Sequence, residues 1–260
     1  MLLGEYFMVS VIFPAAGQGK RMQAGLNKVF LEIAGKPILV HTLLKFSKVP
    51  EIGELIVVVG SDEVAVIEQM LKDVAGLKPY KVVAGGSERQ YSVWNGLQCA
   101  SKAADVVLVH DAARPLVSIN TIENVITAAR RYGGAIAAVP EKNTIKEVVD
   151  GIVASTPDRS SLWAVQTPQG FWHNILFEAN EKAMQDNFLG TDDASLVERL
   201  GKKVHIVMSD YRNIKLTTPE DLIMAEAFIK ENMEKLASKV QVAAKIAKEH
   251  LVTSVKKQDD

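Results

Sequence analysis

Short apolar runs alternate with longer amphipathic segments along most of the chain. The runs are rich in Val and Ile, and each is bounded by Gly, Pro or Asp, a pattern typical of buried strands. They predict strands at Val9–Phe13, Leu55–Val59, Lys81–Ala84, Val106–Val109 and Ala135–Val139. The segments between the runs have the spacing of apolar positions that favours helices. They predict helices at Pro37–Ser47, Asp62–Val74, Glu88–Lys102 and Ile119–Tyr132.

Two of the predicted helices begin with residues that favour the start of a helix. Pro37 stands at a first-turn position, where its missing N–H costs nothing, and Ser118 is placed to cap the helix that follows it. Strands that alternate with helices in this way predict an α/β fold with a mainly parallel sheet and helices on both faces. Ligands of such sheets bind beyond the carboxyl ends of the strands. The loops after the strands are therefore where we look for chemistry.

The pattern changes between Pro140 and Phe171. Short alternating segments and turn signals, such as Asp150-Gly151 and Thr156-Pro157-Asp158, indicate an antiparallel excursion from the main sheet. We expect the sheet to resume with strands at Lys203–Met208 and Ile214–Leu216.

From Asp221 onward the chain has one long helical pattern. Its apolar positions recur at alternating spacings of four and three, which forms a narrow seam. The seam consists of Ile229, Met233, Leu236, Val240, Ala243 and Ala247. A helix folded back on the domain and a helix for self-association both fit this pattern, and the two small alanines favour the first.

Composition restricts the class of protein. The 260 residues carry 30 basic and 31 acidic side chains, so the net charge of −1 creates no global field that would attract nucleic acid or an anionic membrane. The single cysteine, Cys99, excludes an intrachain disulfide and fits a reducing compartment. No apolar stretch approaches the ~20 residues that span a bilayer, and Met1–Ser10 lacks the basic start of a secretory signal. We expect a cytoplasmic protein.

The first predicted strand leads into a glycine-rich loop, Pro14–Met22. Its two glycines allow backbone N–H groups to approach phosphate oxygens. The dinucleotide fingerprint is excluded because Met22 takes the third glycine position, and a P-loop is excluded because Arg21 follows Lys20. Positive charges at Lys20, Arg21 and Lys28 favour a nucleotide phosphate site over a plain turn.

Two further loops follow predicted strands. Gly85–Arg89 opens a helix, where backbone donors collect, although a simple strand-to-helix turn has the same pattern. His110–Pro115 places a carboxylate beside an arginine at the end of a strand, which suits metal or phosphate binding, with a surface salt bridge as the alternative.

Signatures of covalent and metal-centred catalysis are missing from the sequence. The histidines form no HExxH pattern, no CxxC exists with one cysteine, and no Gly-x-Ser-x-Gly elbow occurs. We therefore interpret His41, His110, His173, His205 and His250 as structural or surface residues.

Several segments occur together in the order found in one enzyme family. The chain closely resembles the 2-C-methyl-D-erythritol 4-phosphate cytidylyltransferases of the non-mevalonate isoprenoid pathway, over about residues 9–230. The motifs that carry the resemblance are Pro14–Met22, Lys28, His110–Pro115, Thr167–Gln169, Thr191–Ser195, Asn213–Lys215, Thr217 and Pro219–Asp221. The blocks His110–Pro115 and Asn213–Lys215 are quite specific, whereas many nucleotidyltransferases share the glycine loop.

The resemblance implies a fold and an activity. It implies a Rossmann-like nucleotidyltransferase domain at residues 8–230, with a protruding β-arm at 140–171 that reaches across a homodimer, followed by a C-terminal helical extension at 231–260. The activity implied is transfer of a cytidylyl group from CTP to a sugar-alcohol phosphate, 2-C-methyl-D-erythritol 4-phosphate, with release of pyrophosphate. Mg²⁺ or another divalent cation is the implied cofactor.

The resemblance also implies roles for single residues. Arg21 and Lys28 match cations that stabilise the transition state, and Arg159 and Lys215 match catalytic cations on the acceptor side. The residues that match CTP contacts are Ala15, Ala16, Gly17, Gly19, Gly85, Gly86, Ser92 and Ala112. Those that match acceptor contacts are Asp111, Arg114, Thr144 and Thr167, with Thr144 and Arg159 supplied by the partner's arm. The protein ligands of the metal stay open.

The chain departs from the family's pattern at three positions. Asn27 stands where proline is frequent, Val29 where glutamine is common, and Ser87 where aspartate is often found. These departures affect the expected local contacts with CTP.

Three alternatives stay open. Ribitol 5-phosphate cytidylyltransferases have similar motifs, but their opening loop usually carries paired glycines where this chain has Ala16-Gly17, and they lack the pattern Asp158-Arg159 to Leu162-Trp163. Uridylyl- or guanylyltransferases fit His110–Pro115 poorly. A non-catalytic nucleotide sensor would lose some of the catalytic cations, which are all present here.

Overall fold

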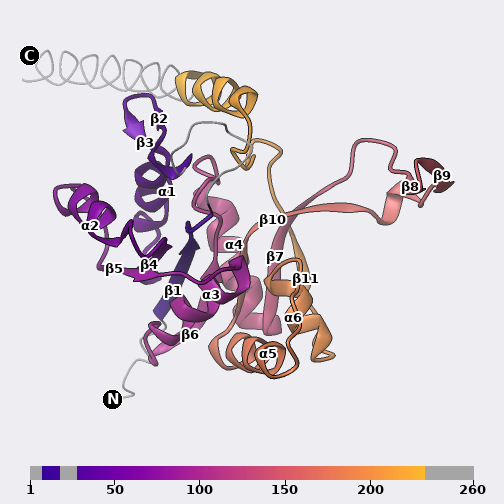
Figure 1. The fold of residues 1–260 in the computed structure, drawn as a ribbon, viewed down its shortest axis with the longest axis horizontal. Helices are drawn as coiled ribbons and strands as arrows, with labels where there is room; N and C mark the ends of the chain where they lie inside the picture. Colours follow the sequence, from indigo (N-terminus) through magenta and orange to yellow (C-terminus); the bar gives the residue numbers. More distant parts are fainter. Residues whose placement is uncertain (1–7, 18–27, 232–260) are drawn as a thin grey trace, which may run out of the picture.

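A seven-stranded sheet with helices on both faces forms the body of the protein (Figure 1). The computed structural model describes residues 8–17 and 28–231. The strand order is β11-β7-β10-β6-β1-β4-β5. All neighbouring strands are parallel except β10, which runs antiparallel to both β6 and β7. The strands are β1 (Met8–Pro14), β4 (Ile52–Val59), β5 (Tyr80–Ala84), β6 (Ala104–Val109), β7 (Gly134–Pro140), β10 (Trp163–Trp172) and β11 (His205–Met208).

Six helices cover the two faces of this sheet within the described residues. They are α1 (Ile38–Ser47), α2 (Val64–Lys72), α3 (Arg89–Gln98), α4 (Ile119–Tyr132), α5 (His173–Gln185) and α6 (Asp193–Arg199). Successive side chains of a strand point to opposite faces. Val11 and Phe13 of β1 accordingly pack in one buried cluster with α1, α2 and α4. Ile12 packs in a second cluster with α3, α5 and α6. These two clusters form the core and hold the strand ends in place.

The predicted strands and helices between residues 9 and 139 are confirmed, with small changes at their ends. Strands β1, β4, β5, β6 and β7 each extend beyond the predicted run, and α2 and α3 are shorter than predicted. The Ser118 side chain accepts a hydrogen bond from the Thr121 N–H and so caps α4, as predicted. Pro37 lies at the position before α1 rather than inside its first turn. The predicted mainly parallel α/β fold is therefore correct.

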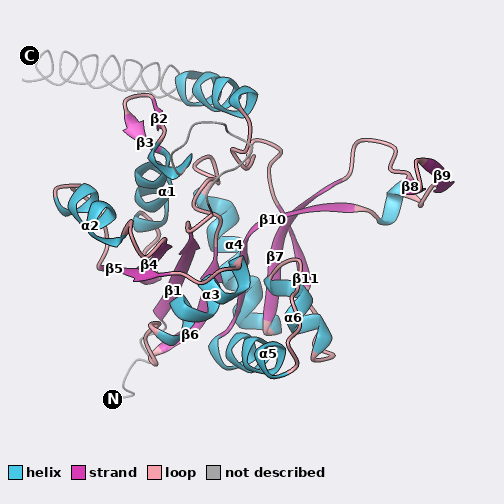
Figure 2. Cartoon of the chain, in the orientation of Figure 1, coloured by secondary structure: helices cyan, strands magenta, loops and turns pink. Residues whose placement is uncertain are grey.

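An arm leaves the sheet after β7 and returns to it at β10 (Figure 2). Its outer part is an antiparallel hairpin of β8 (Glu147–Val149) and β9 (Ile152–Ser155), followed by the 3₁₀ helix η3 (Arg159–Ser161). The antiparallel excursion expected from the sequence is thus present. Its predicted end at Phe171 is wrong as a boundary of the excursion, because residues 163–171 belong to β10 in the middle of the main sheet.

One strand predicted in the second half of the chain is absent from the structure. The strand predicted at Lys203–Met208 is confirmed as β11, but no strand forms at Ile214–Leu216. The backbone N–H of Ile214 donates to Arg212 O and that of Leu216 donates to Ala113 O, so neither joins a sheet ladder. Leu216 is buried in a small cluster with Ile33 and Ile38 of the region around the hairpin β2 (Glu32–Ile33) and β3 (Lys36–Pro37).

The chain is helical over residues 219–231. The Asp221 carboxylate accepts hydrogen bonds from the N–H groups of Thr217 and Thr218 and so holds the loop that leads into this helix. Ile229, the first seam residue, packs against the cluster around Leu216. The rest of the predicted seam lies outside the described residues, and the division into residues 8–230 and 231–260 stays a prediction. Within residues 8–17 and 28–231, no helix has the length and apolarity that crossing a membrane requires.

Candidate functional site

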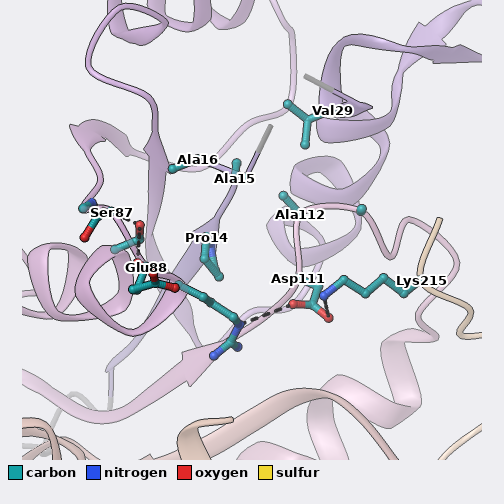
Figure 3. A pocket seen from close by; sticks show the side chains of 14 residues that line it. Pro14, Ala15, Ala16, Val29, Ser87, Glu88, Asp111, Ala112 and Lys215 are labelled. Atoms are coloured by element: carbon teal, nitrogen blue, oxygen red, sulfur yellow. Dashed lines mark hydrogen bonds and ion pairs between the residues drawn. The ribbon is translucent and has the colours of Figure 1, made fainter. Parts of the chain in front are cut away.

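A cavity of about 220 Å³ lies beyond the carboxyl ends of β1, β5 and β6 (Figure 3). Three loops line it, at residues 14–17, 86–89 and 111–113. The side chains of Val29, Ser92 and Lys215 complete the lining. The cavity is therefore at the edge of the sheet where an α/β fold places its ligands.

The loop after β5 packs tightly against the loop after β1. A Cβ atom added to Gly85 would lie 2.7 Å from Ser92 Oγ and 2.8 Å from the Ala16 Cβ, and one added to Gly86 would overlap the Cβ of Tyr91. The Gly86 N–H donates to Ser92 Oγ at 3.2 Å, and this hydroxyl donates to Glu88 O at 3.2 Å. Glycine leaves room at both positions for these neighbouring side chains. Ser92 therefore holds the shape of the turn that lines the cavity.

Asp111 lies at the centre of a charged cluster on the opposite wall. Its Oδ2 is 3.1 Å from Lys215 Nζ and 3.1 Å from Arg114 Nε, and its Oδ1 is 3.8 Å from Arg89 Nε. Arg89 also bonds to Asp193 at the start of α6, at 2.7 Å. Three cations thus surround the Asp111 carboxylate, and the cluster fixes cationic groups beside the cavity.

Electrostatics keep the central carboxylate ionised. Burial alone would raise the pKa of Asp111, but the charges of Lys215, Arg114 and Arg89 outweigh burial and hold that pKa well below its ordinary value. An ionised Asp111 can therefore orient its three cationic neighbours at any pH near neutrality.

The structure brings most of the predicted site residues together. Those that line the cavity are Ala15, Ala16, Gly17, Gly86, Ser92, Asp111, Ala112 and Lys215. Gly85 lies next to Ala16 and Ser92, Arg114 bonds to Asp111, and Thr167 Oγ1 accepts the Asp111 N–H at 3.0 Å.

Four predicted residues are not placed at the cavity. Thr144 and Arg159 are exposed on the arm, where Arg159 Nη1 donates to Lys142 O at 3.1 Å. Neither lines the cavity of its own chain. The arm projects away from the main sheet (Figure 1). Gly19 and Arg21 lie outside the described residues.

Lys28 is placed only in part. It begins the 3₁₀ helix η2 (Lys28–Phe30), directly before Val29 of the cavity lining, and its side chain is outside the described part of the chain.

Sequence reasoning assigned no individual role to several residues that build the site. Arg89 lines the cavity and connects Asp111 to Asp193. The Gln169 side chain accepts from the N–H groups of Asp193 and Ala194 and donates to the Asp192 carboxylate, so β10 fixes the start of α6. One signal was readable, because Asp192 with Ser195 has the spacing of a capping box, which the structure contains.

Comparison with known proteins decides the family. A family model for 2-C-methyl-D-erythritol 4-phosphate cytidylyltransferase matches residues 9–231. The chain belongs to this family. A cytidylyltransferase of that name from Bacillus mycoides is 52% identical over 222 residues, which cover 85% of this chain and 98% of the relative. One from Geobacter metallireducens is 47% identical over 229 residues, covering 86% and 99%.

Solved structures of the cytidylyltransferase family have the same fold. The 4-diphosphocytidyl-2C-methyl-D-erythritol synthase of Anaerococcus prevotii superposes with a TM-score of 0.77 at 33% identity and covers 87% of this chain and 97% of its own. The cytidylyltransferase of Thermus thermophilus has a TM-score of 0.71 at 33% identity and covers 86% and 100%. The resemblance inferred from the motifs is thus confirmed.

Proposed function

We propose that this protein transfers the cytidylyl group of CTP to 2-C-methyl-D-erythritol 4-phosphate and releases pyrophosphate. The observation that carries the proposal is the cavity itself: backbone of the glycine turn on one wall faces the Asp111–Lys215 cluster on the other, in a member of this cytidylyltransferase family. One wall suits a nucleotide and the other an anionic acceptor.

The chemistry needs no protein nucleophile. A phosphate monoester has a second pKa near ~6, so the acceptor is already mostly a dianion at neutral pH. One of its phosphate oxygens forms a bond to the α-phosphorus of CTP, and the bond from that phosphorus to the β-phosphate oxygen breaks. Pyrophosphate leaves with the electron pair. The difficulty is that one anion must approach another, so catalysis rests on positioning and on fixed positive charge.

The nucleotide wall supplies backbone and small side chains. We assign CTP to the loop of Ala15–Gly17, to the turn of Gly85 and Gly86, and to Ala112. Backbone N–H groups of such loops bind phosphate oxygens closely. Ser92 acts through the turn that it holds, because its hydroxyl already bonds to Gly86 N and Glu88 O. From the family resemblance we also assign Gly19 to CTP, and Arg21 and Lys28 to stabilising the crowded α-phosphorus.

The acceptor wall supplies charge in a fixed geometry. Lys215 lines the cavity with 38% of its side chain exposed, which leaves its ammonium group able to meet a phosphate. Arg114 is held more firmly, since its Nε bonds to Asp111 and its Nη1 donates to Asn213 O at 2.7 Å. We assign the acceptor phosphate and hydroxyl groups to Asp111, Arg114, Thr167 and Lys215.

Two acceptor residues come from a second copy of the chain in this proposal. Thr144 and Arg159 lie on the arm and do not line the cavity of their own chain. The hairpin at the end of the arm exposes apolar side chains, with Ile152 at 73% and Val149 at 62% exposure. A two-stranded hairpin is marginal alone in water and gains stability by packing. A two-fold dimer would cover both arms and deliver each Arg159 to the opposite cavity.

The donor set fits a divalent cation that arrives with the nucleotide. Of the described lining residues, Asp111 and Glu88 carry carboxylates. Mg²⁺ is commonly bound by one or two carboxylates together with substrate phosphates. We propose that Glu88 is the protein carboxylate nearest to Mg²⁺, because Asp111 is already engaged by three cations. The metal would screen the charge of the triphosphate when bound.

A matrix of substrates tests the proposal. Pyrophosphate release is measured with CTP, UTP, GTP and ATP, each combined with methylerythritol phosphate and with ribitol 5-phosphate. We expect the highest kcat/KM for CTP with methylerythritol phosphate. A higher kcat/KM with ribitol 5-phosphate would overturn the acceptor assignment. Nucleotide binding without turnover in any combination would instead support the alternative of a non-catalytic nucleotide sensor.

A further inference from the structure

His110 lies beneath the acceptor wall and is fully buried. Its ring packs against the rings of Phe46 and Phe13, with centroid separations of 4.6 Å and 6.1 Å. Both ring nitrogens have polar partners: Nε2 is 3.1 Å from Arg114 O, and Nδ1 is 3.0 Å from Thr167 Oγ1. The ring therefore bridges two acceptor-side residues, one from the loop after β6 and one from β10.

The partners determine where the protons are. A carbonyl oxygen only accepts, so Nε2 carries the hydrogen that it donates to Arg114 O. Burial lowers the pKa of His110 to about 3, although the Arg114 carbonyl and the Asp111 charge oppose that shift, so the ring is neutral and Nδ1 is an acceptor. The Thr167 hydroxyl therefore donates its only proton to Nδ1. The same oxygen accepts the Asp111 N–H at 3.0 Å.

We propose that His110 is a positioning residue for the acceptor, which fixes Asp111, Arg114 and Thr167 relative to one another through a neutral Nε2–H imidazole. The proposal rests on the proposed function, which assigns these three residues to the acceptor. Since the Thr167 proton is donated to His110, Thr167 donates nothing to the acceptor's phosphate and can only accept a hydrogen bond from one of the acceptor's hydroxyl groups. Thr167 also holds the Asp111 backbone.

This arrangement predicts a selective effect on the acceptor. The hydrogen bonds of the His110 ring go to Arg114 and Thr167, whereas the turn of Gly85 and Gly86 on the nucleotide wall is held by Ser92. A histidine that served only as core packing would change stability without separating the two substrates. A positioning residue changes the KM of the acceptor and leaves that of CTP nearly unchanged.

The first test reads the tautomer in the intact protein. The chain is labelled with ¹⁵N at histidine, and the His110 signals are assigned by their loss in His110→Gln. We expect a neutral ring with the hydrogen on Nε2 and no titration between about pH 5.5 and pH 8. A ring that titrates in this range, or one protonated on Nδ1, would overturn the proposal.

The second test compares variants in steady-state kinetics. His110→Phe keeps a ring and removes both hydrogen bonds, so we expect the acceptor KM to rise about tenfold or more and the CTP KM to change less than about twofold. Thr167→Val should have the same selective effect, whereas Thr167→Ser, which keeps the hydroxyl, should recover most of the acceptor affinity. Equal increases in both KM values would contradict the proposal.

If His110→Phe fails to fold, as judged by its circular dichroism, the comparison of Thr167→Val with Thr167→Ser tests the proposal. Equal acceptor KM values for Thr167→Val and Thr167→Ser would overturn the proposal in that case. Failure of the proposed function is visible separately, because the wild-type protein would then not use the acceptor at all. The tautomer measurement is independent of activity and keeps the two outcomes apart.

Discussion

Asp111 organises the acceptor wall at the scale of single residues. Its carboxylate contacts cations from three parts of the chain: Arg89 from α3, Arg114 from the loop after β6, and Lys215 from the segment before the last described helix. Like charges this close repel one another, and the carboxylate between them lowers that repulsion. The wall can thus hold positive charge in a fixed geometry before any substrate arrives.

Removing this one charge should weaken use of the acceptor. In Asp111→Asn the shape is kept but the cations lose their common anion, so we expect kcat/KM for the acceptor to fall by on the order of 10². The matched control is Asp105→Asn, which breaks an ion pair with Arg130 at 2.7 Å near the other end of β6 and should leave kcat/KM unchanged. Wild-type kinetics in Asp111→Asn would show that the cations keep their places without it.

The buried imidazole of His110 should also make the free energy of unfolding depend on pH. The pKa of His110 falls to about 3 on folding from an ordinary value of about 6.5. Between these two pH values the unfolded chain therefore binds a proton at His110 that the folded chain does not bind. This contribution to the free energy of unfolding is complete above about pH 6.5 and is lost as the pH falls towards 3.

Urea unfolding between pH 4 and pH 6 measures this contribution. We expect His110→Gln to reduce the slope of the unfolding free energy against pH by up to about 1.4 kcal/mol per pH unit. The reason is that the unfolded variant no longer binds one more proton than the folded variant at this position. Equal slopes in the variant and the wild type would mean that His110 titrates alike in both states.

At the scale of elements, the turn between β5 and α3 places the nucleotide wall against the loop after β1. Its position depends on the space that Gly85 leaves beside Ser92 and Ala16 and that Gly86 leaves beside Tyr91. A side chain there must move the turn, whereas most of the acceptor wall belongs to other elements.

Gly85→Ala should therefore act mainly on CTP. The added Cβ would lie 2.7 Å from Ser92 Oγ and 2.8 Å from the Ala16 Cβ, so overpacking should raise the CTP KM about tenfold with a smaller change in the acceptor KM. The control is Gly53→Ala at the start of β4, where the new Cβ meets only the flexible Met8 side chain. An unchanged CTP KM in Gly85→Ala would mean that the turn does not bind the nucleotide.

The elements also explain how far the sequence could be interpreted. Strands such as β4 are buried on both sides, so their unbroken apolar runs are readable without any structure. β10 was missed as part of the main sheet because its buried centre contains Gln166, Thr167 and Gln169. These side chains are satisfied by partners far along the chain, and a polar strand has no apolar signal.

Pairs between distant residues limited the prediction of the site. The loops that line the cavity followed from the glycines and from their places after strands. The bond from Arg89 to Asp193 joins residues 104 positions apart, and no spacing rule connects them. Our proposal that Arg159 reaches the cavity of a second chain cannot be derived from local pattern, which describes one chain only.

At the scale of the whole molecule, the projecting arm requires an explanation that the single chain does not supply. Its hairpin exposes several large apolar side chains, namely Val148, Val149, Ile152 and Val153. We propose that a second copy of the chain covers these side chains and receives Arg159 in its cavity.

Mixing two inactive variants tests this arrangement. In a dimer of Arg159→Ala with Lys28→Ala, shared sites leave one cavity with both lesions and one with neither. Equal random mixing should therefore restore about a quarter of wild-type activity. The control is Arg159→Ala mixed with the double variant, which should stay inactive. No recovery after demonstrated subunit exchange would show that each chain builds its own site.

In the proposed reaction the acceptor's phosphate attacks the α-phosphorus of CTP, and isotope labelling tests this step. Methylerythritol phosphate labelled with ¹⁸O in its phosphate is incubated with CTP, Mg²⁺ and the protein, and the products are separated and their masses measured by mass spectrometry. We expect the CDP-linked product to retain all of the label and the released pyrophosphate to contain none. Label in the pyrophosphate, or an unlabelled nucleotide product with labelled orthophosphate, would contradict the proposed reaction.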